Sequence, residues 1–167
     1  SRLYRSAFQQ RLGSARVLNL NAMGMDDEQA IQLAAVLRTG VCANVKVISM
    51  HSNRVTSRGL VAVVAAITAV TFASLKKFIV GNNDFGDVGA NEIAAMITEG
   101  ATKSLEVLDV RSSSISSAGM QALVNAVESK RAPCLRTITA KKNAADESPL
   151  LKALKAQADT LQAQAAM

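Results

Sequence analysis

Aromatic residues make up 3% of this 167-residue chain, and tryptophan is absent. Single-stranded nucleic acids stack their bases on aromatic side chains, so the chain essentially lacks such platforms. The one histidine, His51, cannot form a metal site alone. Neither Cys42 nor Cys134 has a histidine or a second cysteine at metal-ligand spacing. We therefore expect no metal and no cofactor.

Catalytic motifs are also missing. The chain has no glycine-rich phosphate loop, no recognisable Ser/His/acid arrangement and no carboxylate pair set against an apolar pocket. The stretch GNNDFGD (Gly81 to Asp87) contains the Asp-Phe-Gly of protein kinases, but the other kinase motifs are absent. It fails as a calcium loop too, because the twelfth position from Asn82 is Ile93 and not Glu. The acids at 26–28 suit the start of a helix. The sequence predicts a protein that is not an enzyme.

A repeat of 30 residues runs through the chain without an insertion. The copies start at Ala15, Val45, Leu75, Leu105 and Leu135. Counted from these starts, position +3 holds Leu18, Ile48, Phe78, Leu108 and Ile138, and position +10 holds Met25, Val55, Phe85, Ile115 and Ala145. Position +8 is asparagine in three copies, at Asn53, Asn83 and Asn143, with Met23 and Ser113 in the other two. The repeated columns predict one structural unit per copy.

Each copy has the pattern of a strand followed by a helix. Apolar residues at +3 and +5 alternate as in a short strand with one buried face. Those at +15, +18, +19 and +22 have helical spacing, as in Leu60, Val63, Val64 and Ile67. Glycine recurs at +14, where a side chain would crowd the neighbouring backbone. One such unit cannot cover its own apolar face, so the units must stack.

The pattern L-x-x-L-x-L-x-x-N-x-L-x-x-x-G-x-x-x-L-x-x-x-L is similar to leucine-rich repeats of the ribonuclease-inhibitor type. LKKFIVGNNDFGDVGANEIAAMI (Leu75 to Ile97) matches best, and LEVLDVRSSSISSAGMQALVNAV (Leu105 to Val127) follows. The resemblance covers about residues 15 to 145. It implies an α/β fold: a right-handed β-α solenoid forming a short horseshoe arc, with a parallel sheet on the concave face and helices on the convex face.

The resemblance also assigns roles to single residues. It implies a ladder of hydrogen bonds between adjacent coils, made by Asn53, Asn83 and Asn143. Within GNNDFGD, Phe85 becomes a core residue, and the expected loop residues are Gly81, Asn82, Asp84 and Asp87.

We expect a single leucine-rich repeat domain over residues 1–167. Its predicted parts are an N-terminal cap helix (1–14), four 30-residue repeats (15–134), and a degenerate fifth repeat with a C-terminal cap helix (135–167). Such caps keep the apolar ends of a solenoid out of water.

Both predicted cap helices have local signals. In the first, Tyr4, Phe8 and Leu12 recur every four residues. In the second, Ser148 is the expected N-cap and Pro149 the expected first helical residue.

Cysteine usage and hydropathy bear on the compartment. Three coil steps of roughly 4.8 Å place Cys42 and Cys134 about 14 Å apart, beyond the reach of a disulfide. Unpaired thiols fit a reducing, intracellular compartment. The uncharged run from Gly59 to Leu75 keeps the repeat register, so we do not expect a membrane-spanning segment.

The second predicted helix has an unusually apolar outward face. We expect partner contact at Val61, Ala62, Ala65 and Ala69. The equivalent face of the third helix is ordinary, with Asn91, Glu92, Ala95, Thr98 and Glu99. The alternative is an exposed helix that is merely rich in alanine.

Basic residues gather along one predicted edge. The net charge is +6 and the pI about 9.7. A row at +1, interrupted by Glu106, is formed by Arg16, Lys46, Lys76 and Arg136. This basic edge can meet phosphates or an acidic protein, or simply be solvated.

The favoured function is a non-catalytic protein–protein interaction module, a structural or adaptor subunit of a larger assembly. The alternative is an RNA-associated subunit of a ribonucleoprotein that uses the basic edge. The expected partner-binding residues on the concave face are Val17, Asn19, Asn21, Val47, Ser49, His51, Lys77, Ile79, Val107, Asp109, Arg111, Thr137, Thr139 and Lys141. We expect no small-molecule substrate. The arginine-bearing, acid-free start favours a mitochondrial location over a cytoplasmic one.

Overall fold

The computed structural model describes residues 14–67 and 72–166. Within them, one sheet has the strand order β1-β2-β3-β4-β5, and all neighbouring strands are parallel. The strands are β1 (Val17–Asn19), β2 (Val47–Ser49), β3 (Lys77–Ile79), β4 (Val107–Asp109) and β5 (Thr137–Thr139). Each strand residue pairs with the residue 30 positions later, as Leu18 does with Ile48. The period of the sequence is therefore the register of the sheet.

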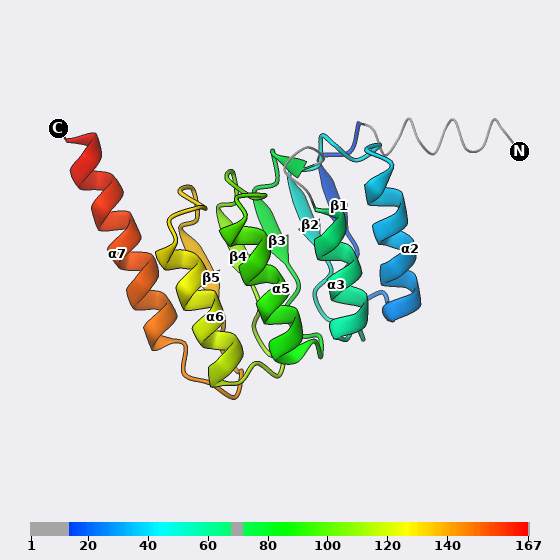
Figure 1. Cartoon of the computed structure of the whole chain (residues 1–167). Coiled ribbons are helices and arrows are strands. Elements are labelled where there is room, and N and C mark those ends of the chain that lie inside the picture. Colours follow the sequence, from blue (N-terminus) through cyan, green and yellow to red (C-terminus); the bar gives the residue numbers. More distant parts are fainter. Residues whose placement is uncertain (1–13, 68–71, 167) are drawn as a thin grey trace, which may run out of the picture.

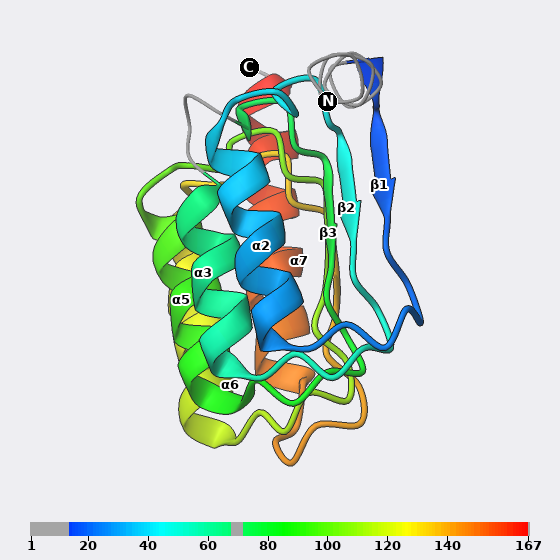
Figure 2. The same cartoon turned by 90° about the vertical axis from the view of Figure 1, so that its right-hand side faces the viewer.

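A helix follows each strand and forms a second layer. The helices are α2 (Asp27–Arg38), α3 (Ser57–Ala66), α5 (Gly86–Thr98), α6 (Ser117–Glu128) and α7 (Ser148–Ala165). They lie side by side in chain order (Figure 1), and the sheet and the helices form separate layers (Figure 2). The predicted α/β solenoid, with the sheet on the concave face and the helices on the convex face, is confirmed.

The core fills the space between the two layers. The +3 side chains of the middle strands, Ile48, Phe78 and Leu108, have no exposed surface. Phe85 of GNNDFGD is 2% exposed and packs in the same cluster. This phenylalanine is thus a packing residue, which accounts for its place in an otherwise polar stretch.

Asparagine side chains at +8 join adjacent coils. The Oδ1 atom of Asn83 accepts from the backbone N–H of Val55 (3.0 Å), and its Nδ2 donates to the carbonyl oxygens of Met50 and Val80 (2.9 and 2.8 Å). Equivalent bonds are made by Asn53 and Asn143. These amides satisfy backbone groups that the short strands leave unpaired, so each coil depends on its neighbour.

The asparagine ladder has a gap. In the fourth coil Ser113 replaces asparagine, and its hydroxyl donates to the carbonyl oxygen of Arg111 in the same coil (3.0 Å). In the first coil Met23 stands at this position and is 65% exposed. The third and fourth coils therefore lack the side-chain bonds that join the second and third.

Two aspartates provide a second kind of link, and we call them the aspartate clamps. Asp87, in the first turn of α5, accepts from the N–H and hydroxyl of Ser116 (2.7 and 2.5 Å) and from the N–H of Gly119 (3.2 Å). Asp27 binds the next helix start in the same way, through Thr56 and Gly59. A Cβ atom at Gly59 would lie 2.5 Å from Oδ1 of Asp27, so the approach requires glycine.

Both clamps are stabilised as carboxylates. The hydroxyl of Ser116, followed by the amides of Ser116 and Gly119, lowers the pKa of Asp87. For Asp27 burial is the largest single effect and raises the pKa. The bonds from Thr56 and Gly59 together outweigh it, so the net pKa is lowered.

Three local predictions from the sequence are wrong. Asp87 was expected in a loop but lies in α5, where its carboxylate reaches the next helix. Ser148 was expected to cap α7 and instead is its first residue, because its hydroxyl donates to Asp146 (2.9 Å) and Glu147 precedes it as N-cap. Pro149 is consequently the second helical residue.

Of the two predicted cap helices, the structure describes the C-terminal one. The predicted cap helix over residues 1–14, with Tyr4, Phe8 and Leu12, lies outside the described residues except for Ser14. At the other end α7 packs against α6. The buried side chains of α7 are Leu150, Ala153, Leu154 and Gln157. The last coil is thereby covered.

We predict that Leu108→Ala destabilises the domain by about 2–5 kcal/mol, because it leaves a cavity at a fully buried +3 position. Urea unfolding measures the change. The control is Asp84→Ala, since Asp84 is exposed within the kinase-like motif, and it should cost less than about 0.5 kcal/mol. If Asp84→Ala proved the more damaging variant, the repeat-based account of the core would be wrong.

We also predict that Asp87→Asn lowers stability at pH 7 by about 1–2 kcal/mol, because charge-assisted hydrogen bonds become neutral ones. The folded-state pKa of Asp87 is lowered from 3.8. Its contribution is therefore complete above pH 4 and is lost as the pH falls through the folded pKa. Urea unfolding from pH 7 to pH 2.5 should show the wild type and Asp87→Asn converging at low pH. A constant difference across this range would contradict the assignment.

Candidate functional site

The concave face carries a stripe of apolar side chains among polar ones. Val17 is 54% exposed, while Val47, Ile79 and Val107 are half-buried on the following strands. The exposed members of the expected set are Asn19, Asn21, Lys77, Arg111, Thr137 and Lys141, and the half-buried ones are His51 and Thr139. The face offers apolar contact with a polar surround.

Some expected contact residues instead position their neighbours. Ser49 is 5% exposed, and its hydroxyl donates to Oδ1 of Asn21 (2.7 Å). The same oxygen accepts from the N–H of His51 (2.8 Å). The ring of His51 in turn shares a 2.7 Å hydrogen bond between Nδ1 and the hydroxyl of Ser52. Asn21 and His51 lie beyond the three-residue strands, at the rim where the strands end.

An ion pair between a buried aspartate and an exposed arginine lies next to this rim. Asp109 is 5% exposed and accepts from Nε (2.9 Å) and Nη2 (2.6 Å) of Arg111. Hydrogen bonding to Asp109 raises the pKa of Arg111. A Cβ atom at Gly81 would lie 2.9 Å from both partners, from Oδ1 of Asp109 and from Cγ of Arg111. Gly81 therefore opens the space in which Arg111 folds back to its carboxylate.

The basic edge is partly neutralised. Glu106, which interrupts the row, accepts from Nζ of Lys76 at 2.5 Å, and both side chains are partly exposed. The hydrogen bond from Lys76 lowers the pKa of Glu106, opposed by a smaller effect of burial. Arg16 and Lys46 are exposed at one end of the row and Arg136 at the other. The exposed basic side chains outside the Lys76–Glu106 pair therefore lie at the two ends of the basic edge.

The convex residues of α3 are less exposed than expected. Val61 and Ala62 are half-buried, Ala65 is exposed, and Ala69 lies outside the described residues. The helix ends at Ala66, because Ile67 leaves the helical conformation as its C-cap.

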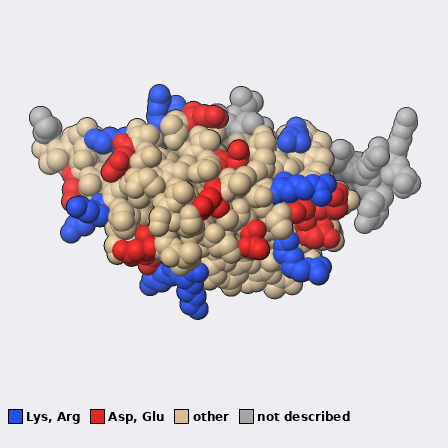
Figure 3. All heavy atoms as spheres, turned by 60° about the horizontal axis from the view of Figure 1, so that its bottom comes forward, with Lys and Arg blue, Asp and Glu red and all other residues tan. Residues whose placement is uncertain are grey.

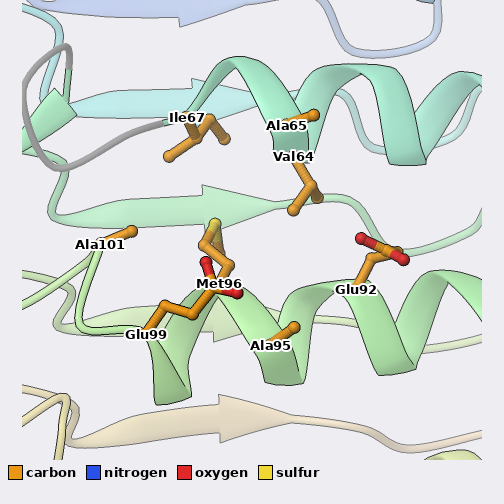
Figure 4. A pocket seen from close by; sticks show the side chains of 8 residues that line it. All are labelled: Val64, Ala65, Ile67, Glu92, Ala95, Met96, Glu99 and Ala101. Carbon is orange, nitrogen blue, oxygen red and sulfur yellow. The ribbon is translucent and has the colours of Figure 1, made fainter.

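Between α3 and α5 the helix layer is hollowed into a groove of about 380 Å³, which we call the α3–α5 groove (Figure 4). Its lining comprises Val64, Ala65, Ile67, Glu92, Ala95, Met96, Glu99 and Ala101. Over the face shown in Figure 3, basic and acidic side chains are interspersed on a largely uncharged surface. The groove is therefore an apolar depression with two carboxylates at its border.

In residues 14–67 and 72–166, no three His, Cys, Asp or Glu side chains converge as metal ligands would. Cys42 is buried and Cys134 half-buried, and both thiols are free. None of the described helices combines the length and apolar character needed to cross a membrane.

Comparison with known proteins agrees with this architecture. The family described as "Leucine Rich repeat" matches residues 73–94 and 103–124, within the third and fourth coils. The two matched segments are similar to leucine-rich repeats, and the solenoid of parallel strands and helices described above is the fold that such repeats form.

Two solved structures resemble the chain along nearly its whole length. One is "Leiomodin-1 Actin-Binding Site 2 (ABS2)", with a TM-score of 0.74 over 93% of this chain and 90% of that one, at 11% identity. The other is the tropomodulin C-terminal domain of Caenorhabditis elegans, with a TM-score of 0.67 over 95% and 96% of the two chains, at 16% identity. At such identities the likeness concerns the fold. No curated protein sequence matches the chain.

Sequence reasoning overlooked the aspartate clamps and the Asp109–Arg111 pair. The clamps had a detectable signal: aspartate at +12 in the first and third copies, with threonine or serine at +11 and glycine at +14 in the next copy. The Asp109–Arg111 pair had a weaker sequence signal, because the glycine that leaves room for it, Gly81, belongs to the preceding repeat. Both features depend on contacts across the 30-residue period.

We predict that Arg111→Ala destabilises the domain by about 1–3 kcal/mol, because the buried Asp109 carboxylate loses its charged partner. Thermal or urea unfolding at pH 7 measures the loss. The matched control is Lys141→Ala, at the same repeat position one coil on and exposed, which should stay within about 0.5 kcal/mol. Equal effects of the two substitutions would show that the pair adds nothing to stability.

Proposed function

We propose that this leucine-rich repeat domain is a non-catalytic protein-interaction module of the ribonuclease-inhibitor type, acting as a structural or adaptor subunit of a larger assembly. The partner occupies the concave face, with the apolar stripe of Val17, Val47, Ile79 and Val107 at its centre. The observation that carries the proposal is this partly exposed apolar stripe on a parallel sheet. Val61, Ala62 and Ala65 on α3 provide a second contact surface.

The physical argument rests on preorganisation. Protein interfaces place apolar side chains at their centre and polar, hydrated side chains at their rim. Here Lys77 lies within the row, between Val47 and Val107 on the neighbouring strands, and Arg111, beyond the end of β4, is already held by Asp109. A fixed sheet loses little conformational entropy when a partner binds, so modest apolar area suffices for affinity.

The structural relatives support a protein partner. The leiomodin domain is described as an actin-binding site. The shared fold makes actin the first protein partner to test.

An RNA partner on the basic edge is the second candidate. Arg16, Lys46 and Arg136 favour it because their side chains are exposed. The ion pair between Lys76 and Glu106 counts against it, since the centre of the row is neutralised. The two candidates differ in their response to salt, which weakens phosphate binding steeply.

We predict that Val47→Asp combined with Val107→Asp weakens partner binding more than tenfold, because two carboxylates would be desolvated at the centre of the interface. The wild type and the variant are used as bait in the cells of origin, and retained proteins and RNA are quantified. Binding of each recovered partner is then titrated with purified components. The control is Gln121→Asp on the exposed side of α6, which should leave binding unchanged.

Two outcomes would contradict the concave-face proposal. One is a protein partner retained equally by the double variant. The other is a partner lost on Lys46→Glu with Arg136→Glu, with affinity falling steeply as salt rises, which would select the RNA candidate.

A further inference from the structure

The α3–α5 groove lies at the weakest junction of the helix layer. The aspartate clamps tie α2 to α3 and α5 to α6, through Asp27 and Asp87. The equivalent position in α3 is Ser57, and among the described residues no such bond joins α3 to α5. These two helices also pack less extensively than either clamped pair. The groove lies further along this junction, beside the C-terminal part of α3 from Val64 to Ile67.

The lining of the groove has a defined chemistry. Its floor is apolar, with Val64, Ile67 and Met96 beneath, and the alanines at its sides are small enough to admit a second element. Figure 4 shows Glu92 and Glu99 on the α5 side. They are seven residues apart, which is two helical turns or about 10.5 Å. In the described part of the chain neither carboxylate belongs to an ion pair. A complementary occupant is apolar along one side and basic beside it.

One segment of this chain has that chemistry. Residues 1–13 contain Arg2, Arg5 and Arg11 and no acid. Three large apolar residues recur there at intervals of four, namely Tyr4, Phe8 and Leu12. As a helix, which the sequence predicts, the segment would be about 20 Å long and would flank an apolar stripe with arginine.

The position of Ser14 favours exchange between molecules. The residue following the segment leads directly into β1, in the sheet layer at the end of the solenoid, whereas the groove lies in the helix layer two coils further on. We propose that residues 1–13 of one copy dock in the α3–α5 groove of a second copy, so that apolar side chains cover its floor and arginines pair with Glu92 and Glu99.

Disulfide trapping between two differently substituted chains tests this proposal. In a Cys134→Ser background, one chain carries Ala7→Cys and the other Ala95→Cys, and Cys42 stays buried. The mixture is oxidised gently, and the disulfide-linked dimer is measured by non-reducing electrophoresis. The matched control replaces Ala95→Cys with Asn125→Cys, the exposed equivalent position on α6. We expect the Ala95→Cys pair to give the mixed dimer and the Asn125→Cys pair to give background.

Charge reversal makes the test specific. Adding Glu92→Lys and Glu99→Lys to the Ala95→Cys chain should lower the dimer yield roughly tenfold, as two weak attractions become repulsions. Adding Arg5→Glu and Arg11→Glu to the other chain should restore it, which a folding defect would not allow. The yield should also fall with salt.

Three results would overturn the proposal. They are equal trapping at positions 95 and 125, trapping that ignores charge reversal, and a disulfide that forms only when both thiols are in one chain. The last result would show that the segment reaches its own groove.

Discussion

Hydrogen bonds between neighbouring coils hold this fold together, because each coil has backbone groups that find a partner only in the next coil. Strands of three residues leave buried N–H and C=O groups at each turn, and an unpaired buried group is costly. The side chain of Asn83, which is 7% exposed, pairs three of these groups: it accepts one hydrogen bond and donates two. A coil cut out of the solenoid would lose both these bonds and the cover over its apolar face. The 30-residue period is therefore a consequence of stacking, and every other feature is placed by it.

The links between coils are unequal. The first two coils share Asn53 and an aspartate clamp, and the second and third share Asn83 but no clamp. The third and fourth share a clamp, while Ser113 leaves the ladder open. In the helix layer, α3 and α5 pack less extensively than the two clamped pairs, and the α3–α5 groove lies at this junction.

The sequence predicted what repeats in every copy and missed what repeats in alternate copies. Apolar columns at +3 and +10 specified strand, register and core, because burial acts on each coil in the same way. Asp27 and Asp87 escaped notice since each was explained locally, as a helix-start acid or a loop residue. Gly81 was interpreted as a loop residue of its own repeat. Glycine is required there because a side chain would collide with Asp109 and Arg111 one coil away. The end of α3 at Ala66, where Ile67 becomes extended, is not marked in the sequence by a glycine or proline.

Amide hydrogen exchange of the native protein tests the dependence of each coil on the next most directly. The N–H of Val55 donates only to the Asn83 side chain of the following coil. Its opening should therefore require separation of the coils, with a free energy close to that of global unfolding. The N–H of Ala43, in a turn within one coil, should exchange much faster. Exchange of Val55 as fast as that of Ala43 in the folded protein would contradict the account.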